Sequence, residues 1–271
     1  MFLGYKPLII GIVVKTGDAT FNLLKSEVVI GLNFKSGSDE SDVAQLSLKK
    51  INQIKLGEHS VFFYEGVNGI HTFFSPIHQW INQRIEKKIK AETGNADLDG
   101  NVYDQVRIAY SIPRTISVVT VSDGSNLNLF PADLHGPAGK SFYISSLRMN
   151  GLANVQVEKY RRIVLSEVNA DQFRKVYALG KNHMKGLRDK NEFELDINSS
   201  EDFGFPLPPG VKRYRELSQI NSFDHGIHRI HIYDVCNEHE ISGLDSELAH
   251  IHSYYAQWRL KKRLATTFLI R

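Results

Sequence analysis

Apolar positions in the first hundred residues fall into short runs that end at turn-forming residues. The runs are rich in branched and aromatic side chains, as is typical of β-strands joined by turns. They occupy residues 7–14, 26–34, 43–48, 59–66 and 69–74. After Pro76 the period changes to that of an amphipathic helix extending to Lys90, with one face formed by Ile77, Trp80, Ile81 and Ile85. We predict a β-rich accessory region with one helix over residues 1–100.

The rest of the chain continues with strand-like runs and adds three helical segments. We expect strands at residues 107–112, 115–121, 127–131, 141–147, 163–168 and 228–235. Ser122 to Ser125 supplies a hairpin turn after the second of these strands. One helix follows Asn150 and another ends near Gly180. The last helix is expected over 244–258, with an apolar stripe formed by Leu244, Leu248, Ile251, Tyr255 and Trp258.

The order of these elements favours a mainly β (α+β) fold. Many short strands with turn signals and no βαβ alternation predict an antiparallel β-barrel decorated with helices. The glycine-rich motifs that cradle dinucleotides and nucleoside triphosphates do not occur, and neither does a G-x-S-x-G elbow. Residues 94–100 form the expected boundary between the accessory region and the barrel. The stripe of the last helix is expected to pack either on the barrel or on a partner chain.

The composition is that of an ordinary globular chain. Its 271 residues carry 33 basic and 30 acidic side chains, without the concentrated basic tract that a nucleic-acid backbone requires. The single cysteine, Cys236, rules out an intrachain disulfide, and we expect it to be a small core residue. The apolar run at 7–14 is too short to span a bilayer. We therefore expect a cytoplasmic protein that binds neither nucleic acid nor a membrane.

Three histidines, His225, His228 and His231, form an H-x-x-H-x-x-H pattern that invites a metal-binding interpretation. Side chains alternate along a strand, so His228 and His231 point to opposite faces and cannot share one ion without a bulge. We expect no metal site there. His250 and His252 are expected on the surface of the last helix.

Four segments of the second part of the chain form an ordered set of motifs. They are IPRTISVVTVSDGSNLNLFP (112–131), FYISSLRMNGLANV (142–155), RIVLSEVNADQF (162–173) and GIHRIHIYDV (226–235). The set resembles the flavin reductase-like, FMN-binding split-barrel family, in which a D-G turn leads to an N-x-x-P segment and a later strand ends in S-x-R before a helix. The likeness implies a flavin reductase-like antiparallel split barrel over residues 101–271.

The resemblance also implies a flavin site. The N-x-x-P segment would border the isoalloxazine ring, whose polar edge needs matched donors and acceptors once buried. That segment consists of Asn128, Leu129, Phe130 and Pro131. Without the resemblance, Asn128 is explained as a cap at the end of a hairpin strand. His228 would lie near the flavin.

The phosphate of FMN would bind at the start of the next helix, because a helix N-terminus presents unpaired N–H groups to an anion. The residues implied there are Ser145, Ser146, Leu147, Arg148, Asn150 and Gly151. Lys181 is a second candidate for the phosphate. By itself, Arg148 is equally explained as a solvated charge after a strand.

Two positions depart from the family pattern. Asp133 stands where the family has a hydroxyl residue, and a carboxylate beside a bound anion is unfavourable unless a cation lies between them. Gly151 replaces a threonine, so it offers its N–H but no hydroxyl donor. These departures imply that FMN binding is weaker than in typical members, or lost.

The function implied by the resemblance is that of an FMN-binding flavoprotein, an oxidoreductase of the NAD(P)H-dependent flavin reductase type. The flavin would carry out the hydride chemistry, and no side chain need act as acid or base. A homodimer with the flavin near the subunit interface is also implied. Two alternatives stay open: a non-enzymatic split-barrel binding protein with a degenerate flavin site, and a haem-handling split-barrel protein, for which the chain has 11 histidines.

Overall fold

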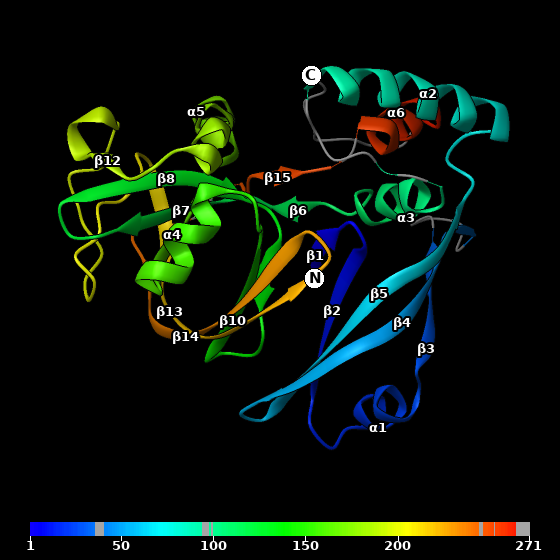
Figure 1. Ribbon diagram of the computed structural model, residues 1–271, viewed down its shortest axis with the longest axis horizontal. Helices are drawn as coiled ribbons and strands as arrows, with labels where there is room; N and C mark the ends of the chain where they lie inside the picture. The colour runs from blue at the N-terminus through cyan, green and yellow to red at the C-terminus, as the bar shows by residue number, and fades with distance from the viewer. Residues whose placement is uncertain (36–40, 94–97, 99, 244–245, 252, 264–271) are drawn as a thin grey trace. The chain divides into compact units, whose positions relative to one another are not determined.

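The computed structural model describes residues 1–35, 41–93, 98, 100–243, 246–251 and 253–263 (Figure 1). Contacts divide the chain into two compact units. Unit 1 comprises Met1, Leu56–His59 and Arg114–His250, and unit 2 comprises Phe2–Lys55, Ser60–Pro113 and Ile251–Arg271. These bounds differ from the expected division at residue 100, which stays a prediction. Residues 94–97 and 99 of the expected boundary lie outside the described residues.

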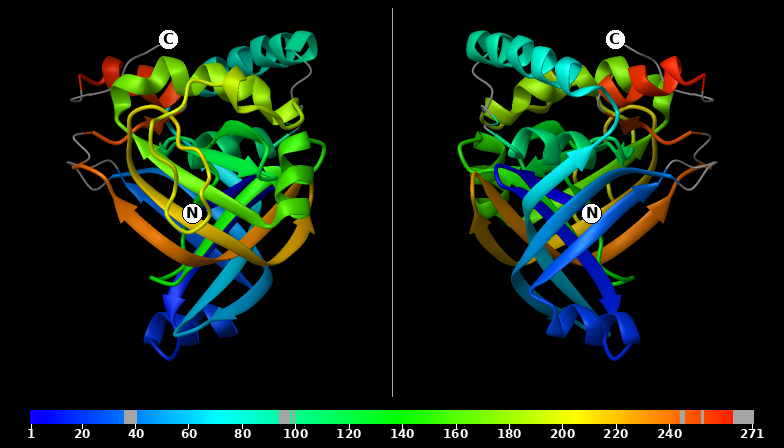
Figure 2. Two further views of the ribbon diagram at one scale, coloured as in Figure 1. Left: turned by 90° about the vertical axis from the view of Figure 1, so that its left-hand side faces the viewer. Right: turned by 90° about the vertical axis from the view of Figure 1, so that its right-hand side faces the viewer.

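Unit 1 is built on an eight-stranded sheet with the order β12–β8–β7–β11–β13–β14–β10–β9, in which each neighbouring pair is antiparallel. The strands are β7 (Ser117–Ser122), β8 (Asn126–Ala132), β9 (His135–Pro137), β10 (Phe142–Arg148), β11 (Arg162–Val168), β12 (Arg188–Asp189), β13 (Val211–His225) and β14 (His228–Glu240). The long strands β13 and β14 are yellow to orange in Figure 2. β6 (Arg114–Thr115) and β15 (Ala249–His250) form a separate pair. The antiparallel, mainly β class is confirmed.

The hairpin of β7 and β8 forms where the sequence predicts it. The carboxylate of Asp123 accepts hydrogen bonds from the N–H groups of Ser125 and Asn126 at 2.9 and 2.7 Å. Gly124 has a φ of 97°, which side chains other than glycine rarely adopt. This turn pairs Val121 with Asn128 and thereby fixes the position of the N-x-x-P segment.

The helix expected after Asn150 is α4 (Leu152–Tyr160). Ala153 and Val157, one turn apart on α4, are buried in a core cluster with inward-facing strand residues. The strand members of this cluster include Val119, Val121, Phe130, Leu147, Leu165, Leu217 and Tyr233. The cluster anchors α4 on the sheet of unit 1.

The other helical segments of unit 1 are short. They are the 3₁₀ turn η1 (Ala170–Gln172), α5 (Phe173–Ala178), η2 (Leu179–Met184) and η3 (Lys190–Glu192). The helix that the sequence predicts to end near Gly180 ends at Ala178, and the chain continues through Gly180 as a tighter 3₁₀ segment. η2 contributes to the candidate site below.

Unit 2 contains a five-stranded sheet with the order β1–β2–β5–β4–β3. Its strands are β1 (Phe2–Tyr5), β2 (Leu8–Lys15), β3 (Val29–Lys35), β4 (Asp42–Leu56) and β5 (His59–His71). Its helices are α1 (Ala19–Ser26), α2 (Pro76–Thr93), α3 (Val102–Ala109) and α6 (Ser253–Lys261). The amphipathic helix predicted after Pro76 is confirmed as α2. No helix in the described part of the chain is long and apolar enough to cross a membrane.

The strand expected over 107–112 is wrong, because most of that segment belongs to α3 and its end. Tyr103, Val106 and Tyr110 follow one another at helical spacing and pack in a small apolar cluster with Leu98. A short apolar run is compatible with the period of a helix or of a strand, and here burial of the helical face favours the helix.

The helix expected over 244–258 is also wrong in its first half. His250 lies in β15, where it pairs with Arg114 of β6, and α6 begins only at Ser253. Leu248 is buried in a core cluster of unit 1, whereas Trp258 belongs to the core of unit 2. The apolar stripe therefore does not lie on one helix. Leu244, His252 and the side chain of Tyr255 lie outside the described residues.

Cys236 is not the core residue that the sequence predicts. Its side chain is exposed on β14 and forms no disulfide. Beyond Tyr233 the even-numbered positions of β14 face the solvent, and Cys236 belongs to this set.

Candidate functional site

Three of the expected site residues meet where β10 ends and β14 begins. Arg148, the last residue of β10, is paired with His228, the first residue of β14. On the same face of β10, the hydroxyl of Ser146 lies 3.2 Å from Nδ1 of His228. Ser145 points to the opposite face of β10, where its hydroxyl lies 3.1 Å from that of Tyr233. Alternation along β10 therefore places Ser146, and not Ser145, beside Arg148 and His228.

The start of α4 follows directly. Gly151 is the residue before the helix, and its N–H donates to the carbonyl of Arg148 at 3.0 Å. A Cβ at position 151 would lie 3.3 Å from the carbonyl oxygen of Arg148 and 3.4 Å from that of His183. No side chain caps this helix start. The first turn of α4 therefore presents backbone N–H groups from which an anion can accept hydrogen bonds.

His183 of η2 connects the start of α4 with the end of β8. Its Nε2 lies 2.7 Å from the carbonyl oxygen of Pro131, to which it donates, and its ring centroid lies 4.9 Å from that of Phe130. Because the carbonyl of His183 also lies against Gly151, this residue brings the N-x-x-P segment and the helix start together. The sequence analysis missed His183, and no local pattern marks a contact that spans 52 positions.

The negative charge of Asp133 is compensated inside unit 1. Its Oδ2 lies 3.1 Å from Nη2 of Arg114, whose side chain is 5% exposed. Nδ1 of His250 lies farther away, 3.8 Å from the same oxygen. Burial raises the pKa of Asp133, but the contact with His250 and the charge of Arg114 outweigh it and hold the pKa below its usual value. Asp133 is therefore ionised at neutral pH and paired with a cation.

The two histidines of the cluster are neutral at neutral pH. Burial, and then the nearby charge of Arg148, lowers the pKa of His228 to about 4, although Asp133 acts in the opposite direction. Burial is also the main reason why the pKa of His183 is lowered. Since both imidazoles are uncharged, the positive charge beside the start of α4 comes from Arg148.

Arg148 also has a side-chain donor that could bind a ligand. Its Nε is buried and has no hydrogen-bond partner within the described residues. A buried donor without a partner costs about 1–3 kcal/mol, so such groups are commonly satisfied by a ligand or by water. An anion held at the first turn of α4 would satisfy this donor. The residues present therefore fit the phosphate of a nucleotide.

The other expected cofactor residues lie around this cluster. Nδ2 of Asn128 donates to Oε1 of Gln156 and to the carbonyls of Asn182 and Lys185, at 2.9, 3.0 and 3.3 Å. Oδ1 of Asn128 has no partner in the described part of the chain. The remaining residues are either buried in apolar clusters or exposed: Leu129, Phe130 and Leu147 are buried, and Asn150 and Lys181 are exposed. Their contact with a flavin stays a prediction.

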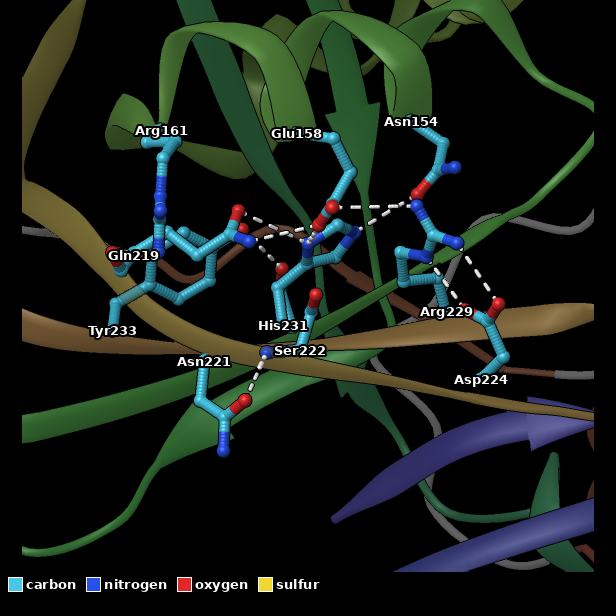
Figure 3. A network of polar contacts seen from close by, with 11 residues as sticks. Asn154, Glu158, Arg161, Gln219, Asn221, Ser222, Asp224, Arg229, His231 and Tyr233 are labelled. Atoms are coloured by element: carbon cyan, nitrogen blue, oxygen red, sulfur yellow. Dashed lines mark hydrogen bonds and ion pairs between the residues drawn. The ribbon is translucent and has the colours of Figure 1, made fainter.

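A polar network fixes α4 from its other side (Figure 3). His231 of β14 is completely buried, with Nε2 3.0 Å from Oδ1 of Asn154 and Nδ1 3.1 Å from Oε1 of Glu158. Nε2 of Gln219 donates to the same carboxylate oxygen at 2.8 Å. Asn154 and Glu158 are one turn apart, so a single imidazole holds two positions of α4. The network therefore sets where the start of α4 lies.

The histidines of the H-x-x-H-x-x-H pattern have separate surroundings. His228 contacts Ser146, whereas His231 contacts Asn154 and Glu158. Among the described residues, no group of three or more histidine, cysteine, aspartate or glutamate side chains is arranged to hold a metal ion.

Comparison with known proteins gives matches among solved structures only. No protein-family model matches the chain, and no curated protein matches it. The NADH:FAD oxidoreductase of Streptomyces globisporus is 16% identical at a TM-score of 0.48, and the match covers 55% of this chain and 88% of that chain. The flavin reductase component of a bacterial two-component tryptophan halogenase is 17% identical at a TM-score of 0.48, covering 55% of this chain and 92% of that chain.

An FMN-binding protein from Thermus thermophilus is 21% identical at a TM-score of 0.45, and the match covers 52% of this chain and 83% of that chain. The solved structures to which about half of this chain is similar include flavin reductases and FMN-binding proteins.

Proposed function

We propose that unit 1 is a split barrel that binds a flavin nucleotide, specifically FMN. We further propose that it acts as an NAD(P)H-dependent flavin reductase or a related oxidoreductase. The observation that carries the proposal is the buried Nε of Arg148, which has no hydrogen-bond partner among the described residues, close in the chain to a start of α4 that no described side chain caps. This is the arrangement expected of a site for a phosphate group.

The cluster divides naturally into a phosphate end and a ring end. Arg148 and the backbone N–H groups of the first turn of α4 would hold the phosphate, because the N–H of Gly151 is already donated to the carbonyl of Arg148. The carbonyls that neighbour Gly151 leave little room for a side chain at that position. Pro131 and His183 lie toward the ring, with neutral His228 behind Arg148. Asp133 does not repel the phosphate strongly, because Arg114 neutralises it.

A bound flavin would supply the hydride chemistry, and the chain would bind and orient it and exclude water. The segment of Asn128, Leu129 and Phe130 would border the ring, as the resemblance implies, while Ser145, Ser146 and Leu147 belong to the strand that ends at Arg148. Asn150 and Lys181 are exposed and would contact the phosphate only at its edge. We name no side chain as an acid or base. A homodimer and a cytoplasmic location stay predictions from the resemblance and the composition.

The test compares FMN with riboflavin, which lacks the phosphate. Purified protein is titrated with each ligand and the visible absorption spectrum is recorded. We expect saturable binding of one FMN per chain and weaker binding of riboflavin. Arg148→Gln should weaken FMN binding by about tenfold or more and leave riboflavin binding nearly unchanged, since only the phosphate contact is lost. Arg174→Gln, an exposed arginine on α5, is the matched control.

Absence of a perturbed flavin spectrum would remove this proposal, and equal loss of FMN and riboflavin binding in Arg148→Gln would remove the phosphate assignment. A nucleotide-oxidation assay with FMN present then separates an enzyme from a non-enzymatic flavin-binding protein. Saturable binding of haemin in place of FMN would favour the haem-handling alternative.

A further inference from the structure

The amphipathic helix α2 has its apolar side turned toward solvent. Ile77, Trp80, Ile81 and Ile85 are 71%, 54%, 41% and 51% exposed. The polar side of α2 faces the rest of unit 2, where Nε2 of Gln79 donates to the carbonyls of His71 and Phe74 at 3.1 and 2.7 Å. A surface helix of a globular protein ordinarily has the reverse arrangement. The exposed apolar side chains of α2 are therefore able to contact an apolar environment outside the protein.

Cationic side chains accompany this apolar face. Arg84 and Lys88 follow Trp80 at steps of four and so lie on the same side of α2. The guanidinium of Arg84 stacks on the Trp80 ring, 3.9 Å from its centroid. On the polar side of α2, Nζ of Lys261 lies 5.4 Å from the ring centroid of Phe74, so Arg84 and Lys88 are the cations that belong to the apolar face. An occupant of this face would thus meet apolar and positive groups together.

We propose that α2 docks unit 2 on an anionic lipid bilayer, lying in the plane of the interface with its isoleucines and Trp80 inserted. Amphipathic helices that bind in this manner combine a tryptophan and aliphatic face with flanking lysine and arginine residues. Anionic headgroups complement the positive charge of Arg84 and Lys88. This binding is peripheral and departs from the sequence-based expectation of no membrane partner.

A second copy of the chain fits this surface less well. Two such faces would bring like charges together, since each carries Arg84 and Lys88. Among the side chains that the structure describes on α2, the apolar face comprises four residues, whereas a stable protein interface uses about 20–30 residues on each side. Insertion into a lipid interface needs only the apolar face of one helix.

The test is co-sedimentation of the whole protein with vesicles of phosphatidylcholine alone or of equal parts phosphatidylcholine and phosphatidylserine. We expect binding to the anionic vesicles and little to the neutral ones. The chain has two tryptophans, and Trp258 is already buried, so Trp80 should account for a blue shift of emission on binding. Trp80→Phe should remove this shift and retain most of the sedimentation.

Variants separate the apolar and the charged contributions. Ile81→Gln/Ile85→Gln should weaken vesicle binding by about tenfold or more, and Arg84→Gln/Lys88→Gln should reduce the preference for phosphatidylserine. Ile197→Gln, at a 97% exposed isoleucine of unit 1, is the matched control and should bind like the unaltered protein. All these positions are at the surface, so folding is expected to be preserved.

The proposal is overturned if the protein does not sediment with the anionic vesicles, or if it binds neutral and anionic vesicles equally. It is also overturned if Ile81→Gln/Ile85→Gln binds as well as the unaltered chain. Self-association that this variant abolishes, without any binding to vesicles, would identify the face as a protein–protein interface and not a lipid-binding one.

Discussion

Arg114 of β6 forms an ion pair with Asp133, with Nη2 3.1 Å from Oδ2, across the end of the β8 strand. Asp133 departs from the pattern of the family that the sequence resembles, and under the proposed function its carboxylate would lie near a bound anion. The ion pair with Arg114 compensates this negative charge and so reduces its repulsion of an anion. Arg114 comes from the strand that pairs with β15, so the compensation depends on the fold of unit 1 and not on neighbouring sequence.

Replacement of Arg114 by methionine should therefore impair both stability and flavin binding. An uncompensated half-buried carboxylate should lower the free energy of unfolding by about 2 kcal/mol. Under the proposed function it should also weaken FMN binding by about tenfold, because Asp133 then repels the phosphate. Urea unfolding and FMN titration measure the two effects.

Arg114→Met/Asp133→Asn is the decisive companion of that variant. Removal of both charges should restore much of the FMN affinity and part of the stability. If the double variant binds FMN as poorly as Arg114→Met alone, the charge of Asp133 is not what Arg114 controls.

Asn128 provides a second prediction, because its amide nitrogen lies within hydrogen-bonding distance of oxygens of Gln156 in α4, of Asn182 in η2 and of Lys185 directly after η2. Asn128→Ala should lower the free energy of unfolding by about 2–3 kcal/mol, since it leaves buried acceptors without their donor. Asn198→Ala, at an exposed asparagine, should change it by less than about 0.5 kcal/mol. An unchanged urea midpoint in Asn128→Ala would show that these hydrogen bonds add nothing to stability.

The sequence was a good guide where local chemistry determines structure. Asp123 and Gly124 predict the β7–β8 hairpin because turn geometry needs those residue types, and the helical period after Pro76 predicts α2. The strand expected over 107–112 failed because a short apolar run fits two periods. The prediction of the last helix over 244–258 failed because it continued the helical period across His250, which pairs with Arg114 in a strand.

The candidate site, too, was predicted from the sequence only in part. The resemblance placed Arg148, Gly151, Pro131 and His228 in one site. The structure brings Gly151 and Pro131 together at His183, and it pairs Arg148 with His228. Their flavin-binding roles stay predictions. His183 itself, and the pairing of Arg114 with Asp133, arise from contacts between distant segments. Hydrophobic periodicity and turn signals carry no information about such contacts.

Glu167 gives a third prediction, concerning the stability of unit 1. Its carboxylate is 8% exposed and accepts from Nε and Nη2 of Arg213 at 3.0 and 2.5 Å, and also from Arg215. Burial raises its pKa, but the hydrogen bonds from the two arginines outweigh it and lower the pKa below the usual value. Glu167→Gln should cost about 3 kcal/mol of unfolding free energy, because Arg213 loses the counter-charge of Glu167 and Arg215 keeps only that of Glu238.

The matched control for Glu167 is Glu194, whose ion pair with Lys175 is exposed on both sides. Exposed pairs contribute little, so Glu194→Gln should leave the urea midpoint nearly unchanged. Equal effects of the two substitutions would mean that burial of the Glu167 carboxylate has no energetic consequence.

The fourth prediction concerns pH. Burial lowers the pKa of both His228 and His231 to about 4, whereas an unfolded histidine titrates near about 6.5. Between these values the unfolded chain binds protons that the folded chain does not, so the free energy of unfolding should fall as the pH falls from about 6.5 toward about 4. Each histidine contributes a slope of at most about 1.4 kcal/mol per pH unit.

Urea unfolding between about pH 7 and about pH 5 measures this slope, and the window avoids the carboxylates of Asp133 and Glu167, whose lowered pKa values place their own loss of stability at lower pH. His231→Gln should reduce the slope, because glutamine takes up no proton in either state, even if it also lowers stability at neutral pH by breaking the contacts with Asn154 and Glu158. A slope that is the same with and without His231 would show that this histidine is already charged in the folded protein. The Glu158 carboxylate would then outweigh burial, and the fixed position of α4 would depend on an ion pair.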